Sequence, residues 1–456
     1  IFFRGPCRIM SRTTSKFRHV FPTPAKTDGQ FRDIKTSNTI WDCSNFVAAN
    51  SKYLALAWAA GGGGKLAVIN LENTVKIPSD VPCLMGHTGP ILDWQFHPFA
   101  DNLIATSSED TTVRIWSIPD GGLTQNLDTQ LITLSGHTKK VGICQFHHVA
   151  MNTLTTASMD HTVKLWDIEV GEKLTVDVHK DQIFSLSYCL EGNQFVTTSR
   201  DKSIRVVDPR SNAVAAEAKG HLGNKAQKAI WAKRQNKIIT AGFGKMQDRQ
   251  VYVWDPRKMD EKVQEVELDT ASGVMMMFFD EDTNMLYLGG KGDGNIRFYE
   301  LGEKELTQLG EMPSSNPQRG LAMLPKVACD TTVCEVARFM RLESDKVVPI
   351  SFQCPRKQAK DEFQADVYPD TFSTSPTMSA ADFFGGQTSA PNTMPMQHTK
   401  GGAAAGSTSA ELHVASAAPI SKTEIEAQKA KVLKLREELA AAEAKLAQLE
   451  ADFASP

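Results

Sequence analysis

The clearest pattern in this chain is a short run in which apolar and polar positions alternate, preceded by a tight turn centred on Asp. Alternation with a period of two is typical of a β-strand with one buried face. Five such runs end in an aromatic residue or Val, mostly followed by an acid, at residues 110–116, 160–167, 201–208, 248–255 and 293–300. The spacings between the end residues are 50, 41, 47 and 45, which indicates an internal repeat.

A period near 45 residues with this ending is typical of the blades of a WD40 β-propeller. Two strands at 53–58 and 66–69, joined by the glycines at 61–64, predict an earlier blade. A seventh blade has to combine strands at 334–339 and 347–352 with one N-terminal strand, which closes the ring and leaves no open sheet edge. We therefore predict an all-β seven-bladed WD40 β-propeller over residues 15–357, after an N-terminal tail at 1–14.

Histidines precede the repeated strands, as in Gly86-His87, Gly136-His137 and Gly220-His221, with Val178-His179 as a degenerate copy. In a propeller blade, such a histidine commonly forms a buried hydrogen-bonded chain with a Ser or Thr, the turn Asp and the terminal Trp. Ser107 and Ser158 are the expected hydroxyl donors. A buried imidazole needs hydrogen-bond partners, so we interpret these residues as structural rather than as metal ligands or acid–base catalysts.

The composition changes after residue 357. Residues 386–421 are rich in Ser, Thr, Pro, Gly, Ala and Met, which predicts a flexible linker. The short apolar piece at 380–384 interrupts the polar sequence just before it, and we expect this piece to dock back on the propeller.

The segment 422–454 lacks Gly and Pro, and its apolar residues repeat every seven positions, which predicts an α-helical coiled coil that mediates oligomerisation. The predicted core consists of Ile425, Val432, Leu435, Leu439, Ala442, Leu446, Leu449 and Phe453. In an antiparallel pair the flanking charges are all attractive: Lys429 with Glu450, Arg436 with Glu443, Lys431 with Asp452, and Glu438 with Lys445. A parallel pair would place some like charges together, so the pattern predicts an antiparallel homo-oligomer, either a dimer or a tetramer.

Composition excludes several classes of function. The 456 residues have a net charge of −3 and a pI near 6.5, so there is no overall signal for nucleic-acid binding. The eight cysteines show no zinc-ligand spacing, and no apolar run approaches the roughly 20 residues of a membrane span. No nucleophile–base pair stands out. We expect no catalytic residues, no metal and no cofactor, hence a protein that is not an enzyme.

The order of a WD propeller, a linker and a short coil resembles that of the coronins, a family of actin-binding proteins. Residues 15–21, 119–123, 136–143, 267–274, 278–293, 318–321 and 355–357 are similar to family motifs. Residues 366–371 resemble an extension that packs beneath the propeller, which suggests that 358–385 form this extension. Arg436 is followed by Glu437, where the trimer motif of the family has an apolar residue; this departure argues against a parallel trimer.

The resemblance implies binding to actin filaments, cross-linking through the coil, and control of branching and turnover through the Arp2/3 complex and cofilin. It also implies a place in the cytoplasm, at the actin cytoskeleton and cell cortex. Lys35 occupies the position of a basic residue that matters for filament binding in the family. Further candidate contacts are Arg32, Lys16, Arg18, Lys139 and Lys140. The alternative hypothesis is a general WD40 adaptor that recruits a complex without actin.

Overall fold

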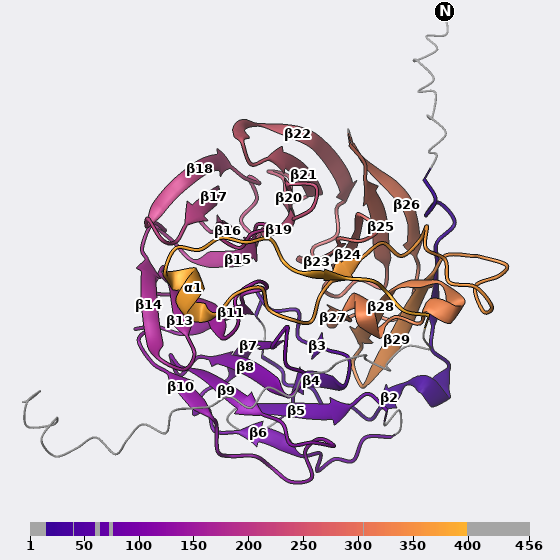
Figure 1. Ribbon diagram of the computed structural model, residues 1–456, viewed down its shortest axis with the longest axis horizontal. Coiled ribbons are helices and arrows are strands. Elements are labelled where there is room, and N and C mark those ends of the chain that lie inside the picture. Colours follow the sequence, from indigo (N-terminus) through magenta and orange to yellow (C-terminus); the bar gives the residue numbers. More distant parts are fainter. Residues whose placement is uncertain (1–14, 40, 60–63, 73–75, 304, 399–456) are drawn as a thin grey trace, which may run out of the picture. The chain divides into compact units, whose positions relative to one another are not determined.

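The computed structural model describes residues 15–398 except 40, 60–63, 73–75 and 304. The strands of these residues form seven antiparallel sheets arranged as the blades of a ring, and an extension crosses one face of that ring (Figure 1). The predicted seven-bladed propeller is therefore confirmed. The linker beyond residue 398 and the coil at 422–454, with all its core and charge-pair residues, lie outside the described residues.

Blades 1 to 6 are each a meander of four consecutive strands, and the first strands of neighbouring blades contact one another around the central channel. Blade 1 contains β3 (Ala48–Ala49), β4 (Tyr53–Ala57), β5 (Lys65–Asn70) and β6 (Cys83–Met85). Blade 2 contains β7 (Ile91–Phe96), β8 (Leu103–Ser108), β9 (Val113–Ser117) and β10 (Ile132–Leu134). Blade 3 contains β11 (Val141–Phe146), β12 (Thr153–Ser158), β13 (Val163–Asp167) and β14 (Gly171–Val176).

The second half of the ring follows the same plan. Blade 4 contains β15 (Ile183–Tyr188), β16 (Phe195–Ser199), β17 (Ser203–Asp208) and β18 (Ala213–Lys219). Blade 5 contains β19 (Lys228–Ala232), β20 (Lys237–Phe243), β21 (Arg249–Asp255) and β22 (Lys258–Asp269). Blade 6 contains β23 (Met275–Asp280), β24 (Met285–Gly290), β25 (Ile296–Leu301) and β26 (Leu306–Met312).

Blade 7 joins the N-terminal and C-terminal parts of the propeller. It contains β27 (Gly320–Met323), β28 (Glu335–Leu342) and β29 (Lys346–Gln353), and its outer strand is β1 (Phe21–Pro24). β1 runs antiparallel to β29, with Phe21 opposite Gln353 and Pro24 opposite Ile350, and β2 (Phe31–Arg32) pairs with the other end of β29. The predicted closure of the ring by an N-terminal strand is confirmed.

The burial of the strands explains why the alternating pattern is visible only in part. The second strands β8, β12 and β16 are buried at every position because neighbouring blades cover both of their faces. The fourth strands β14 and β18 at the rim combine exposed positions with a few buried or half-buried ones. Strands in the interior of the blades are thus buried on both faces, whereas strands at the rim are buried on one face only.

The extension after the propeller contains β30 (Thr371–Phe372), the helix α1 (Ala380–Phe384) and β31 (Thr393–Met394). Short 3₁₀ turns lie at Thr27–Gly29, Lys326–Ala328 and Thr331–Val333. Val367 and Phe383 are fully buried against the propeller, so the expected docking of the segment at 380–384 is confirmed. Ser379 begins α1 with a capping box, in which its hydroxyl accepts a hydrogen bond from the Asp382 backbone N–H.

The extension is longer than the sequence indicates. β31 pairs with β30, Met396 is buried in a core cluster, and His398 Nε2 lies 3.1 Å from the Lys360 carbonyl oxygen. Residues 386–398, which we expected in the flexible linker, therefore belong to the packed extension. Composition alone missed this because backbone pairing and one buried Met suffice to fix a polar segment.

Candidate partner-binding face

The propeller has two faces with different loops. The upper face consists of the loops between consecutive blades and the turns between the second and third strands of each blade. The lower face carries the extension, through backbone pairing of Ala150 with Met378 and a hydrogen bond from Arg234 to the Asp370 carbonyl. Figure 1 views the molecule from this lower side, with the extension in front of the blades. The upper face is the side that the extension leaves open.

On the upper side of blade 2, a buried histidine ties the turn to the blade interior. His87 Nδ1 lies 2.8 Å from Asp110 Oδ2, and His87 Nε2 lies 2.8 Å from Thr106 Oγ1. Trp116 Nε1 donates to the same threonine oxygen at 2.9 Å. Blade 3 repeats this chain with His137, Asp160, Thr156 and Trp166. These hydrogen bonds agree with the interpretation of the histidines and turn aspartates as structural residues of the blades.

The two serines predicted to supply the hydroxyl groups of these hydrogen-bonded series, Ser107 and Ser158, were the wrong residues. Ser107 donates to the Asp93 carbonyl on the neighbouring strand, because it faces the opposite side of β8 from Thr106. Ser158 ends β12, and its Oγ donates to the Lys140 carbonyl and accepts from the Asp160 N–H, so it fixes the turn instead. The threonines lie one or two positions earlier in each strand.

The turn carboxylates are held ionised. Burial acts to raise the pKa of Asp110, but hydrogen bonds from His87 and Thr112 outweigh it and keep that pKa well below its ordinary value. Blades 4 and 5 differ, because Asp201 pairs with Arg205 at 2.7 Å and Asp248 accepts from Gln250 Nε2 at 2.5 Å. Carboxylates engaged in this way stabilise turns.

One segment crosses the upper face and enters the channel, and the sequence analysis did not single it out. We call residues 36–46, of which residue 40 is not described, the crossing segment. Trp41 Nε1 donates to the Gly142 carbonyl in blade 3 at 2.9 Å. Lys291 of blade 6 donates to the Trp41 carbonyl at 2.7 Å, and Lys228 of blade 5 donates to the Cys43 carbonyl. Three blades thus hold the segment in place.

Two of these anchors are lysines removed from solvent. Burial lowers the pKa of Lys291 to about 7 and lowers that of Lys228 as well. Burial also raises the pKa of nearby Asp93 to about 6, although the Cys144 N–H and Lys228 act against the rise. A buried ammonium needs acceptors, and the carbonyls of the crossing segment supply them. The lysines therefore act as anchors of the backbone rather than as exposed nucleophiles.

The basic residues named from the sequence fall on both faces. Arg32 and Lys35 are exposed at the upper rim where blades 7 and 1 meet. The backbone of Arg32 lies opposite that of Lys346 in the pairing of β2 with β29. The Lys35 carbonyl accepts a hydrogen bond from the Ala59 N–H at 2.7 Å. Next to them, Lys76 forms an ion pair of 3.1 Å with Asp33. These side chains project from the start of the crossing segment.

Lys139 and Lys140 lie on the upper face between blades 2 and 3. Lys140 Nζ is 3.2 Å from Glu109 and 5.0 Å from the centroid of the ring of Trp41, the middle residue of the crossing segment. Lys16 and Arg18 lie instead on the lower side, where Lys16 donates to the Asp366 carbonyl of the extension. The structure therefore groups Arg32, Lys35, Lys139 and Lys140 on one face and separates Lys16 and Arg18 from them.

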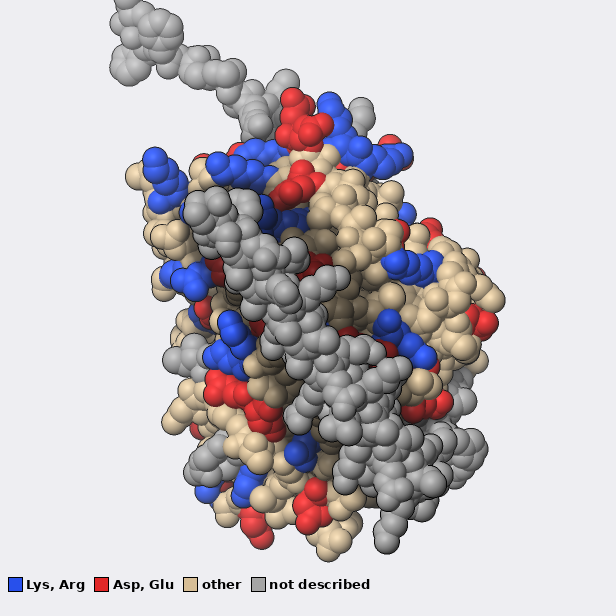
Figure 2. Space-filling view, turned by 90° about the vertical axis from the view of Figure 1, so that its left-hand side faces the viewer, with Lys and Arg blue, Asp and Glu red and all other residues tan. Residues whose placement is uncertain are grey.

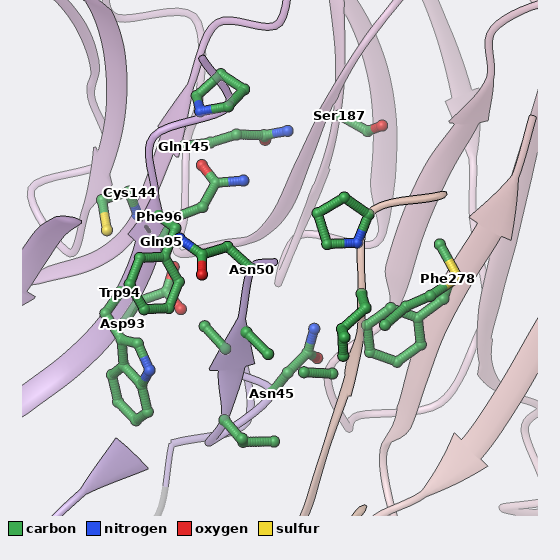
Figure 3. Close-up of a pocket in the computed structure, with 18 of the residues that line it drawn as sticks. Asn45, Asn50, Asp93, Trp94, Gln95, Phe96, Cys144, Gln145, Ser187 and Phe278 are labelled. Carbon is green, nitrogen blue, oxygen red and sulfur yellow. Dashed lines mark hydrogen bonds between the residues drawn. The ribbon is translucent and has the colours of Figure 1, made fainter. Parts of the chain in front are cut away.

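The central channel contains a cavity of about 560 Å³ (Figure 3). Its polar side chains are committed to the backbone of the next blade: Asp93 Oδ2 accepts from the Cys144 N–H at 3.1 Å, and Gln95 Oε1 accepts from the Phe146 N–H at 2.6 Å. Ser187 Oγ likewise accepts from the Trp231 N–H at 3.0 Å. The lining thus joins the inner strands of neighbouring blades, and its chemistry is structural.

Within the described residues, no group of three or more His, Cys, Asp or Glu side chains is placed to hold a metal ion. No helix of that part of the chain is long and apolar enough to cross a membrane.

Three family models match five segments of the chain. A domain of unknown function, DUF1899, matches residues 11–76, and a type of WD40 repeat matches residues 347–391. The WD domain, G-beta repeat, matches residues 79–117, 128–167 and 171–208. A chain in the crystal structure of a mitotic checkpoint complex shares the fold, with a TM-score of 0.56 and 16% identity over 77% of this chain and 98% of that chain. Fold and repeats together define a WD-repeat β-propeller protein.

Closer relatives narrow this class. The WD40 domain of a Toxoplasma gondii coronin superposes with a TM-score of 0.79 and 34% identity, over 84% of this chain and 98% of that one. Coronin-A of Dictyostelium discoideum is 48% identical over 384 residues, which cover 84% of this chain and 85% of that protein. The chain belongs to the coronin family.

Proposed function

We propose that this protein binds actin filaments through the upper face of its propeller, along the crossing segment. The observation that carries the proposal is the placement of Arg32 and Lys35 just before this segment and of Lys140 beside Trp41, in the middle of it. Actin filaments are acidic, so exposed cations on one rigid face favour both encounter and orientation. Three anchoring hydrogen bonds keep the segment in one conformation, which lowers the entropic cost of binding.

Lys35 is the residue on which this proposal depends most. It is exposed, and its carbonyl bonds to Ala59 of blade 1, so its backbone is fixed while its side chain remains free to reach a partner. A lysine offers one compact charge and not the planar fork of arginine, which reduces the geometric demand on the partner carboxylate. Charge is therefore the property of residue 35 that should matter.

We further propose that the segment at 422–454 forms an antiparallel dimer or tetramer, so that one particle carries several propellers. Joining binding modules raises overall affinity by making the second contact intramolecular, and it allows filaments to be cross-linked. Regulation of branching and turnover, through the Arp2/3 complex and cofilin, belongs to the same proposal, as does a cytoplasmic location at the actin cytoskeleton and cell cortex.

Co-sedimentation with actin filaments tests the proposal. The samples are the full chain, a 1–420 truncation, Lys35→Glu, and Arg18→Glu as a control with the same charge change on the lower face. We expect the full chain and Arg18→Glu to pellet alike, Lys35→Glu to pellet about tenfold more weakly, and the truncation to be a weakly pelleting monomer. Failure of the full chain to pellet at modest salt would remove the actin assignment and favour the adaptor hypothesis.

A further inference from the structure

A second part of the upper face, over blades 4 and 5, combines exposed cations with exposed apolar side chains. We define the blade 4–5 patch as residues 200–202, 219–225 and 244–248. Lys202 Nζ donates to the Leu222 carbonyl at 2.6 Å, and the Gly223 N–H donates to the Phe243 carbonyl at 2.7 Å. The two turns and the loop between the blades are therefore bonded to one another and form a continuous surface.

The apolar part of the patch is unusual for a water-facing loop. Met246 is 89% exposed, the highest value for a large apolar side chain among the described residues, and Leu222 on the adjoining loop is 44% exposed. Neither side chain belongs to a core cluster. Large apolar side chains that neighbour each other on a surface mark interaction sites more often than isolated ones do.

The charged part of the patch has a single net sign. Arg200, Lys219 and Lys245 are exposed, and no ion pair of 4.0 Å or less joins any of the three to an acid in the described part of the chain. The two acids of the patch are engaged in their own turns, Asp201 with Arg205 at 2.7 Å and Asp248 with Gln250. The free charge that a partner meets here is therefore positive.

The patch lies across the ring from Arg32 and Lys35, which are one part of the site proposed for actin. Blades 4 and 5 stand opposite the junction of blades 7 and 1, where Arg32 and Lys35 project (Figure 1). In Figure 2, which views the side of blades 3 and 4, Lys and Arg side chains are spaced along the left-hand margin. A partner bound at this patch could remain bound while the opposite rim contacts another protein.

We propose that the blade 4–5 patch is a second docking surface, and that it takes an acidic, extended segment of another protein with a large apolar side chain between its carboxylates. The apolar side chain packs on Met246 and Leu222, and the flanking carboxylates pair with Lys245, Arg200 and Lys219. Because the patch is positive, its partner must carry negative charge. Because two apolar side chains are exposed between the cations, the partner must also supply an apolar side chain to pack on them. This inference does not depend on actin binding.

The test uses the full chain and a short fluorescent peptide rich in Glu and Leu. We expect the wild type to bind this peptide in fluorescence anisotropy with an affinity that falls as salt rises. A Lys- and Leu-rich peptide of the same length should bind far more weakly. Leu222→Ser/Met246→Ser and, separately, Lys245→Glu should each weaken binding about tenfold. The controls are Val170→Ser, which changes a 71% exposed apolar side chain on the lower side, and Lys173→Glu; both should bind like the wild type.

Three results would overturn the proposal. One is that the wild type does not bind the acidic peptide, or binds it no better than the basic one. Another is that the patch variants bind as the wild type does. A third is that the patch variants lose actin pelleting to the same degree as peptide binding, because the surface would then be part of the filament site. Binding of phosphatidylserine vesicles in place of the peptide would assign the patch to membranes and also overturn the proposal.

Discussion

Lys140 holds its ammonium group 5.0 Å from the centroid of the Trp41 ring and 3.2 Å from the Glu109 carboxylate, so that blades 2 and 3 and the crossing segment meet at one side chain. A cation over an indole ring contributes roughly 0.5–1 kcal/mol at such an accessible site. The contact matters mainly because it places Lys140 beside the crossing segment, whose first residue directly follows Lys35. The basic residues proposed to contact actin are thus linked through the fold.

Gly142 should tolerate no larger residue while Trp41 is present. A Cβ atom at this position would lie 2.3 Å from Trp41 Cζ2, so Gly142→Ala must displace the indole ring. We expect a loss of about 1–3 kcal/mol in unfolding free energy, measured by chemical denaturation. In a Trp41→Ala background the same change should cost much less; equal costs in the two backgrounds would show that Trp41 does not occupy this place.

Arg249 should be among the most sensitive charged residues. Its guanidinium is 1% exposed and bonds to Asp269 at 2.6 Å and to Asp293 of the next blade at 2.7 Å. Arg249→Leu leaves Asp293 without its ion-pair partner and leaves Asp269 with Arg297 alone, and we expect a loss of about 3–5 kcal/mol. Arg257→Leu is the matched control, since that exposed arginine pairs only with Asp255 and its removal should cost less than about 1 kcal/mol. Comparable melting temperatures for the two variants would contradict the prediction.

Phe383 should hold the extension on the lower face. It is fully buried, its ring centroid lies 4.5 Å from that of His147, and Arg210 stacks on it while bonding to the Gly386 carbonyl. Phe383→Ala should lower the unfolding free energy by about 3–5 kcal/mol and expose residues 370–398 to protease. Phe384→Ala, which changes the adjacent and less buried ring, provides the comparison and should protect the segment better.

Stability should fall in mild acid. Burial lowers the pKa of His97 from 6.5 to about 3, and its Nδ1 accepts a hydrogen bond from the Phe99 N–H at 3.1 Å. Between these two pH values His97 binds a proton in the unfolded chain but not in the folded chain. The free energy of unfolding therefore rises with pH through this window. Each such histidine contributes up to about 1.4 kcal/mol per pH unit. His97→Asn, which retains an acceptor, should flatten the dependence of unfolding free energy on pH between 6 and 4; an unchanged slope would contradict this assignment.

The parts of the fold that were predictable carry local signals. The Asp-centred turns and alternating strands repeat, so each blade is visible within its own sequence, and the need to close the sheet edge pointed to an N-terminal strand such as β1. The crossing segment has no such signal. Trp41 bonds to Gly142, 101 positions away, and to Lys291, 250 positions away, so its place follows only from the closed ring.

The candidate site shows the same limit. Basic residues were recognisable one by one, but the separation of Arg18 from Lys35 depends on the direction of β1 along β29, which brings the chain from the lower to the upper side between them. The hydroxyl residues of the buried chain were misplaced because side-chain parity along β8 decides between Thr106 and Ser107. To predict which side chains share a face, the register of the strands must therefore be known as well as the residue types.

The pairing of β1 with β29 has a consequence for synthesis of the protein. Phe21 leaves the ribosome long before Gln353, the residue it lies opposite. At roughly 5–20 residues per second, the first strand waits on the order of half a minute with its backbone groups unpaired. During this time the ring is incomplete, and its unpaired strand edges are able to pair with another copy of the chain. The ring can close only after the strands of the last blade have been synthesised.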